Sequence, residues 1–169
     1  PELPPMLCRD YENLPGGWQE VARKRVFPML PGLFERMSVA LENIRESSGE
    51  ILEHAVSKLG FPEPLRIVSY VGLSNVAGWA TKWGGFPAVL LGLESIAELG
   101  WHEKGKVMAL TAHEAGHLFM NSKRSSANSE RLARNALSQL YEEGFAQHCE
   151  HIVMGRRTWS CESQEGWLE

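Results

Sequence analysis

The sequence of 169 residues has few cysteines, no long hydrophobic run and no basic cluster, and each absence excludes a class of protein. Its three cysteines, Cys8, Cys149 and Cys161, are odd in number and widely spaced, which excludes a disulfide framework and a CxxC metal site and favours a reducing compartment. No apolar run approaches the roughly 20 residues of a membrane helix. The formal net charge is −4 and no basic stripe indicates nucleic acid, so we expect neither nucleic acid nor a membrane segment.

The first residues also lack the charged and apolar regions of a signal peptide. The chain begins with Pro1 and not with Met, so we expect that the natural N-terminus is absent. Together with the cysteine usage, this predicts a cytoplasmic protein.

The length suits one domain with a hydrophobic core, here residues 1–169. Residues 1–17 are rich in Pro and Gly and predict an extended arm. Apolar residues then recur at helical spacing over 33–44, and the Ser-Ser-Gly stretch 47–49 is expected to break that helix. A second helix over 51–59 is expected to end at Gly60.

Beyond Pro62 and Pro64 the pattern changes to strands, predicted at 65–72, 78–83 and 88–94, with a Gly-Pro turn between the last two. Helical periodicity returns over 106–121. A polar loop at 122–129 precedes a long helix over 130–154, which Gly155 ends, and residues 156–169 predict an irregular tail. Helices, then a small sheet, then two helices indicate an α+β fold in a single domain.

The penultimate predicted helix contains His113-Glu114-Ala115-Gly116-His117, an HExxH motif. Residues four apart share a helix face, so both imidazoles could bind one zinc ion. Glu114 lies about 100° further round the helix, where it could take a proton from water as a general base. Gly116 is unfavourable inside a helix and suggests close approach of another backbone. The motif is short, and a chance match in an amphipathic helix is the alternative.

A catalytic zinc site needs a third protein ligand. The metzincin pattern HExxHxxGxxH fails, because Met120 and Lys123 occupy its last two defined positions. Residues 139–151, QLYEEGFAQHCEH, instead contain Glu143 followed by Gly-Phe-Ala. Glu143 is predicted to lie on a core-facing stripe of its helix, where a carboxylate is costly unless it is paired or bound to metal. That stripe comprises Leu132, Ala136, Leu140, Gln147, Glu150 and Met154.

The two motifs together resemble those of the gluzincin metallopeptidases, whose third ligand is a Glu in an EGFA-type segment downstream of HExxH. The resemblance covers residues 106–154, and it extends to a small bacterial family of zinc-dependent proteases that includes YjaZ. It implies a zincin-like fold, zinc (Zn2+) bound by His113, His117 and Glu143, and Glu114 as the catalytic base. Between His117 and Glu143 lie 25 residues, a longer spacer than many gluzincins have.

Supporting roles stay open at this point. Gln147 and Glu150 are candidates for orienting a ligand histidine. Tyr70 and Tyr141 are candidates for oxyanion stabilisation. His148 is expected to point away from the helix face of Glu143, and His151 only partly toward it. Cys149 is expected to be a buried structural residue. The segment 86–94 is the candidate strand for pairing with substrate.

These features predict a zinc metallopeptidase that acts on a peptide or protein substrate, with water activated by the metal and by Glu114. Two alternatives remain. One is a zinc-stabilised binding or regulatory domain without turnover. The other is a zinc hydrolase with a non-peptide substrate, which a roofed-over site would favour.

Overall fold

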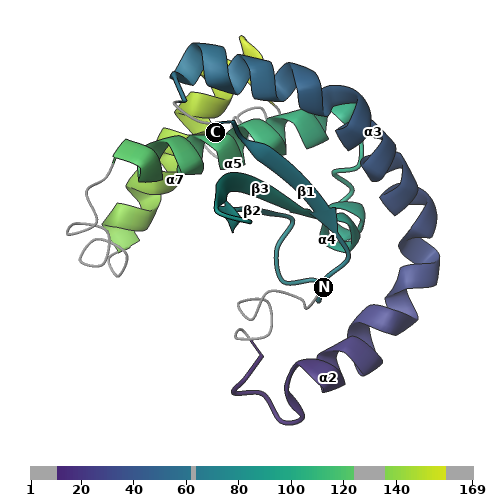
Figure 1. Ribbon diagram of the computed structural model, residues 1–169. Helices are drawn as coiled ribbons and strands as arrows, with labels where there is room; N and C mark the ends of the chain where they lie inside the picture. Colours follow the sequence, from purple (N-terminus) through teal and green to yellow (C-terminus); the bar gives the residue numbers. More distant parts are fainter. Residues whose placement is uncertain (1–10, 62–63, 124–135, 159–169) are drawn as a thin grey trace, which may run out of the picture.

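The computed structural model describes residues 11–61, 64–123 and 136–158 (Figure 1). A long helical segment comes first, a three-stranded sheet follows, and further helices complete the chain. This order confirms the predicted α+β class. None of the described helices combines the length and hydrophobicity that a membrane-crossing helix requires.

The N-terminal helical segment begins earlier than the sequence indicated and has no break before Leu59. It comprises α2 (Gly17–Val21), the π-helix η1 (Ala22–Val26) and α3 (Phe27–Leu59). The predicted break at 47–49 is wrong, because α3 is continuous there. Burial of one face outweighs the local breakers, and the Ser47 hydroxyl donates a hydrogen bond to the Asn43 carbonyl at 2.6 Å. That buried face comprises Met37, Ala40, Ile44, Ser47, Ile51, Ala55 and Leu59.

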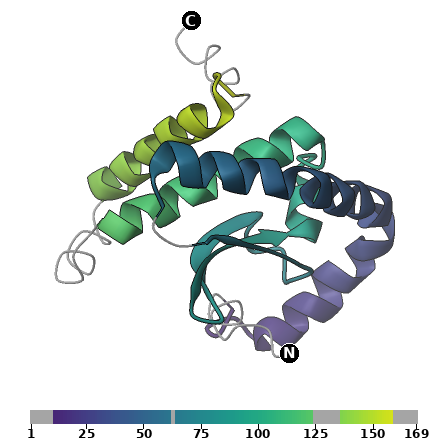
Figure 2. The same ribbon diagram turned by 45° about the horizontal axis from the view of Figure 1, so that its top comes forward.

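The predicted end at Gly60 is confirmed, since Gly60 caps α3 in the left-handed conformation with φ of 72°. Two prolines lie at the start of the same helix. Pro28 is in the first turn, where a missing N–H is tolerated, and Pro31 is inside the helix. The π-helix lies directly before them, and the segment curves around the domain (Figure 2).

The sheet contains β1 (Arg66–Tyr70), β2 (Gly78–Trp83) and β3 (Phe86–Gly92) in the order β1-β3-β2. All three strands lie close to their predicted positions. The turn between β2 and β3 lies within the predicted Gly-Gly-Phe-Pro stretch at 84–87. It is formed by Gly84 and Gly85, with φ of 59° and 85°, while Phe86 and Pro87 belong to β3. The third strand ends at Gly92, so Glu94 belongs to the short helix α4 (Leu93–Glu98) and not to a strand.

Strand β3 is parallel to β1 on one side and antiparallel to β2 on the other. Its backbone groups are therefore engaged along both edges, and five consecutive residues, 88–92, are buried. Strand β2 is an edge strand of the sheet within the described part of the chain. The edge that remains available for a further strand next to the HExxH helix is thus that of β2.

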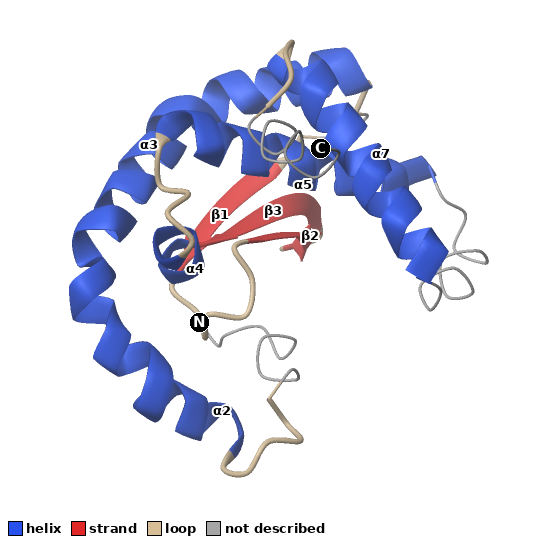
Figure 3. Cartoon of the chain, turned by 180° about the vertical axis from the view of Figure 1, so that it is seen from behind, coloured by secondary structure: helices blue, strands red, loops and turns tan. Residues whose placement is uncertain are grey.

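The HExxH helix is α5 (Lys104–Lys123), and the helix that contains Glu143 is α7 (Ala136–Met154). Helix α5 packs against α7, α3 and the strands β2 and β3, so it forms the centre of the domain (Figure 3). The predicted helix at 106–121 is confirmed and extends to Lys123. Residues 124–135, with most of the predicted polar loop and the start of the last helix, lie outside the described residues, as do 1–10 and 159–169.

Candidate metal centre

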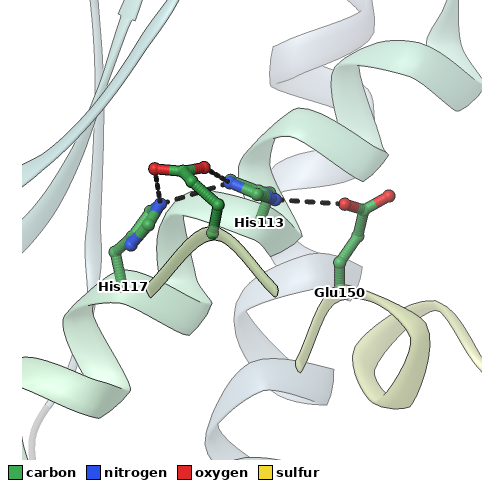
Figure 4. Close-up of polar contacts among 4 residues, drawn as sticks. His113, His117 and Glu150 are labelled. Atoms are coloured by element: carbon green, nitrogen blue, oxygen red, sulfur yellow. Dashed lines mark hydrogen bonds and ion pairs between the residues drawn. The ribbon is translucent and has the colours of Figure 1, made fainter. Parts of the chain in front are cut away.

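Helix α5 directs His113 and His117 to one point, because the two residues are one helical turn apart. Their Nε2 atoms are 3.2 Å apart, and both rings are partly buried beside α7 (Figure 4). The predicted convergence of the two histidines is therefore present in the structure.

Glu143 reaches the same point from α7. Its Oε2 is 3.2 Å from Nε2 of His113, and its Oε1 is 3.6 Å from Nε2 of His117. The structure thus brings together the three residues predicted from separate motifs, as a group that could hold a metal ion.

The prediction that Glu143 lies on a core-facing stripe of its helix is wrong. Leu140 is 70% exposed, and the side chain of Glu143 is 64% exposed. The buried face of α7 comprises Ala146, Cys149, Glu150 and Val153. Glu143 lies three residues before Ala146 and seven before Glu150, so it is at the solvent-facing end of this face. Its proximity to the histidines comes from helix packing and not from burial.

The three side chains lie close enough together to bind one metal ion. Zinc binds imidazole nitrogen and carboxylate oxygen at about 2.0–2.2 Å, so two ligand atoms of a tetrahedral site are separated by roughly 3.3–3.5 Å. The Nε2 atoms of His113 and His117 are 3.2 Å apart. Oε2 of Glu143 is 3.2 Å from Nε2 of His113 and its Oε1 is 3.6 Å from Nε2 of His117, so the two contacts are made by different oxygens of one carboxylate. Three lone-pair donors at such distances repel one another unless a cation or protons lie between them. Two imidazole nitrogens and one carboxylate form a donor set that zinc and other divalent metals take in proteins.

Glu150 orients the His113 ring by contacting Nδ1, the ring nitrogen that does not face Glu143 and His117. It is 2% exposed, and its Oε2 is 3.3 Å from Nδ1 of His113 (Figure 4). An Nδ1–H that donates to this carboxylate leaves the Nε2 lone pair free to face Glu143 and His117. Glu150 was one of two sequence candidates for this role. The other, Gln147, is partly buried on the same helix.

The two histidines titrate differently. Burial disfavours the charged form of His113, but the Glu150 hydrogen bond and the charges of Glu114, Glu150 and Glu143 outweigh burial and raise its pKa. Burial, followed by the positive charge of His113, lowers the pKa of His117. Three carboxylates around two imidazoles give this centre a negative electrostatic potential, which favours the binding of a cation.

Glu114 lies beside this centre, against the edge strand β2. It is 9% exposed and accepts a hydrogen bond from the backbone N–H of Ala80. Burial is the main cause that raises the pKa of Glu114 to about 7, with a further contribution from Glu143, against the lowering effects of His113 and the Ala80 N–H. A carboxylate with a raised pKa is a stronger base, as general base catalysis near neutral pH requires.

Comparison with family models, curated proteins and solved structures gives no match to this chain.

A glycine allows the close approach of β2 to Glu114. A Cβ at Gly78 would lie 2.8 Å from Glu114 Oε1 and 2.9 Å from Leu110 Cδ1. Sequence reasoning did not select Gly78, although a glycine at the start of a strand can mark such an approach. The loop before it is fixed by Glu94, which is fully buried and whose Oε1 accepts hydrogen bonds from the N–H groups of Gly72 and Ser74 at 2.9 and 3.1 Å. No sequence motif identified Glu94.

Gly116 has the role that the sequence suggested. A Cβ there would lie 2.9 Å from both Cα and the carbonyl oxygen of Ala146 in α7, and 2.9 Å from Cβ of Cys149. Glycine therefore permits the spacing of α5 and α7 that places Glu143 beside the two histidines.

We expect Gly116→Ala to destabilise the protein by about 1–3 kcal/mol, because the backbone of α7 would have to move away. The matched control is Gly49→Ala in α3, where a Cβ would meet nothing within 4 Å and helix propensity predicts a gain of up to ~1 kcal/mol. Urea unfolding of both variants measures the difference. Equal stabilisation by both substitutions would show that the backbone of α7 is not closely packed against Gly116.

Two cavities flank the contact between Glu114 and β2. The smaller, of about 360 Å3, is lined mainly by apolar residues, including Leu99, Trp101 and Leu110, and reaches His113 and Glu114. The larger, of about 690 Å3, lies between β2 and the C-terminal half of α5. The smaller cavity thus reaches the site itself and the larger one lies next to it along β2, while the exposed side chain of Glu143 leaves the ligand cluster open to solvent.

The remaining candidates stay outside the ligand cluster. Cys149 is 2% exposed and burial raises its pKa, which agrees with a structural thiol, and His148 is exposed. Tyr141 is 63% exposed, with its ring 6.2 Å from that of Phe145. The Tyr70 pKa is raised by burial and by the charges of Glu94 and Glu114, but no contact to the three ligand residues is recorded for its hydroxyl.

Proposed function

We propose that this chain is a zinc-dependent metallopeptidase with His113, His117 and Glu143 as metal ligands and Glu114 as general base. The observation that supports the proposal most directly is the convergence of these three ligand atoms within 4.8 Å of one another, next to a buried carboxylate of raised pKa. The gluzincin resemblance of the sequence supports the same reading.

The proposed chemistry divides between the ion and the chain. Bound zinc would supply Lewis acidity and make water a better nucleophile at neutral pH. Glu114 would accept a proton from the attacking water and deliver it to the leaving amine. Glu150 would keep His113 in the tautomer that presents Nε2, and Ala80 would hold the Glu114 carboxylate in place through its N–H.

The substrate strand requires a correction. The segment 86–94 cannot take up a peptide by strand addition, because β3 already pairs with β1 and β2. Strand β2 provides the edge instead, and its residues Gly78 and Ala80 are the ones that contact Glu114. A peptide added there would pass the metal centre and both cavities. Such an open site favours a peptide over a small non-peptide substrate.

The zinc-stabilised domain without turnover is the competing class. Structural zinc sites are usually closed by four protein ligands. The cluster found among the described residues has three, which leaves one position for water or substrate. The buried Glu114 beside that position supplies a proton acceptor, which a catalytic site requires and a structural site does not, so the arrangement favours catalysis.

Metal analysis and peptide cleavage test the proposal together. We expect the purified protein to contain about one zinc per chain, to cleave a mixed peptide library, to lose cleavage with a chelator and to regain it when zinc is restored. Tight zinc binding without cleavage of any peptide would instead support the binding domain. Cleavage that survives complete removal of metal would refute the mechanism.

A further inference from the structure

The larger cavity beside the metal centre has a chemical character of its own. Its walls come from β2, from the start of β3 and from the last turns of α5. The lining residues are Phe61, Ala80, Thr81, Lys82, Pro87, Leu118, Asn121 and Ser122. It differs from the smaller cavity, whose described lining is largely apolar.

This cavity continues from the position of Glu114 along both of its walls. On α5, Leu118 is one turn beyond Glu114 and shares its face, and Asn121 and Ser122 lie one turn further. On β2, Ala80 donates its N–H to Glu114, and Lys82 lies two residues further, roughly 7 Å along the strand. A peptide paired with β2 would thus place a side chain here a short distance from the scissile bond.

The charge of the cavity comes from Lys82. Lys82 is exposed and is the one ionisable side chain among the described lining residues, and no carboxylate of the described ranges lies within ion-pair distance of it. The Asn121 amide on α5 adds a polar group that can donate hydrogen bonds. A single ammonium with neutral donors, in a chain of net charge −4, selects an anionic partner.

We propose that this cavity is a substrate subsite that selects an acidic side chain, with Lys82 as its specificity-determining residue. The inference rests on the proposed peptidase function and adds a substrate class: peptides with Asp or Glu close to the cleaved bond on the side where the chain passes Lys82. The apolar lining of the smaller cavity suits an uncharged side chain on the opposite side.

The test uses peptides that differ only in the position of a single glutamate, each compared with the same peptide containing Gln or Lys there. For the zinc-loaded protein we expect one position at which Glu is preferred over Gln by about fivefold in kcat/KM, as for a partly exposed ion pair. Lys82→Glu should invert this preference in favour of Lys, and Lys82→Met should abolish it without inversion. Higher salt should weaken the preference.

The matched control is Lys104→Glu, which makes the same change in net charge on an exposed residue at the far end of α5. It should leave the preference unchanged. An equal effect of both charge reversals would indicate long-range attraction and overturn the subsite. An unaltered Glu preference in a folded Lys82→Glu protein would do the same.

Calorimetric binding of the same peptides separates this inference from the proposed function. Glu-selective binding that depends on Lys82, without cleavage, would support the proposed subsite and contradict the proposed peptidase function. Cleavage without any positional Glu preference would retain the peptidase and remove the subsite. Peptides that are neither cleaved nor bound would overturn both.

Discussion

Glu114→Gln is expected to leave zinc near one ion per chain and to slow peptide cleavage by at least ~10²-fold, within the 10²–10⁴-fold range of general base catalysis. The physical reason is that Gln keeps the shape of Glu and can still accept the hydrogen bond from the Ala80 N–H, but it cannot accept a proton from water. Removal of a buried carboxylate with a raised pKa should not reduce stability.

Zinc content, circular dichroism and initial rates of the variant and the parent protein measure this result. Glu103→Gln is the matched control, because Glu103 is exposed and lies just before α5. A Glu114→Gln protein with full activity would remove the peptidase mechanism. A variant that loses its zinc would show that Glu114 holds the ion and would reverse the roles assigned to the two glutamates.

Glu143→Gln is expected to reduce zinc affinity by more than the roughly 10–100-fold that loss of a group behind a ligand costs, and to reduce activity in parallel. The carboxylate of Glu143 supplies both a lone pair and a negative charge at 3.2 Å and 3.6 Å from the two imidazoles, and the amide keeps only a weaker donor oxygen. Because the side chain is 64% exposed, its replacement should not disturb the core.

Competition with a chelator of known affinity measures the change in zinc binding. Glu142→Gln makes the same chemical change one residue earlier, outside the three-residue cluster, and should keep affinity within a small factor. Equal zinc affinity for Glu143→Gln and the parent protein would exclude Glu143 as a ligand. One zinc-binding assay thus separates the two roles: Glu114→Gln should keep zinc, as expected for a proton acceptor, and Glu143→Gln should bind it more weakly, as expected for a metal ligand.

Local features of the protein follow from the sequence alone. The pair His113 and His117 faces one point because residues four apart on a helix share a face, and α5 obeys that period. The strands follow from β-rich stretches between Gly and Pro residues, and they lie within a few residues of their predicted ends. Glu143 is predicted by a motif resemblance, whereas helical periodicity gives its burial wrongly, since its side chain is 64% exposed.

The tertiary structure decided what depends on contacts between distant segments. Strand order is such a property: periodicity identifies a strand, but it does not say whether that strand is central or at an edge. The central position of β3, which prevents it from pairing with a substrate, is therefore visible only in the structure. The continuity of α3 through 47–49 is another property of this kind. Burial of one face along the whole helix stabilises it more than the Ser-Ser-Gly stretch destabilises it.

The environment of the site is decided in the same way. Glu114 and Glu143 are both glutamates near the same histidines, yet one is 9% exposed against β2 and the side chain of the other is 64% exposed on α7. The partnership of Glu150 with His113 and the placement of Lys82 in a cavity beside Glu114 likewise join residues far apart in the chain. Short-range periodicity fixes which face of a helix a side chain occupies, whereas its burial, its partners and its pKa depend on which elements pack against that face.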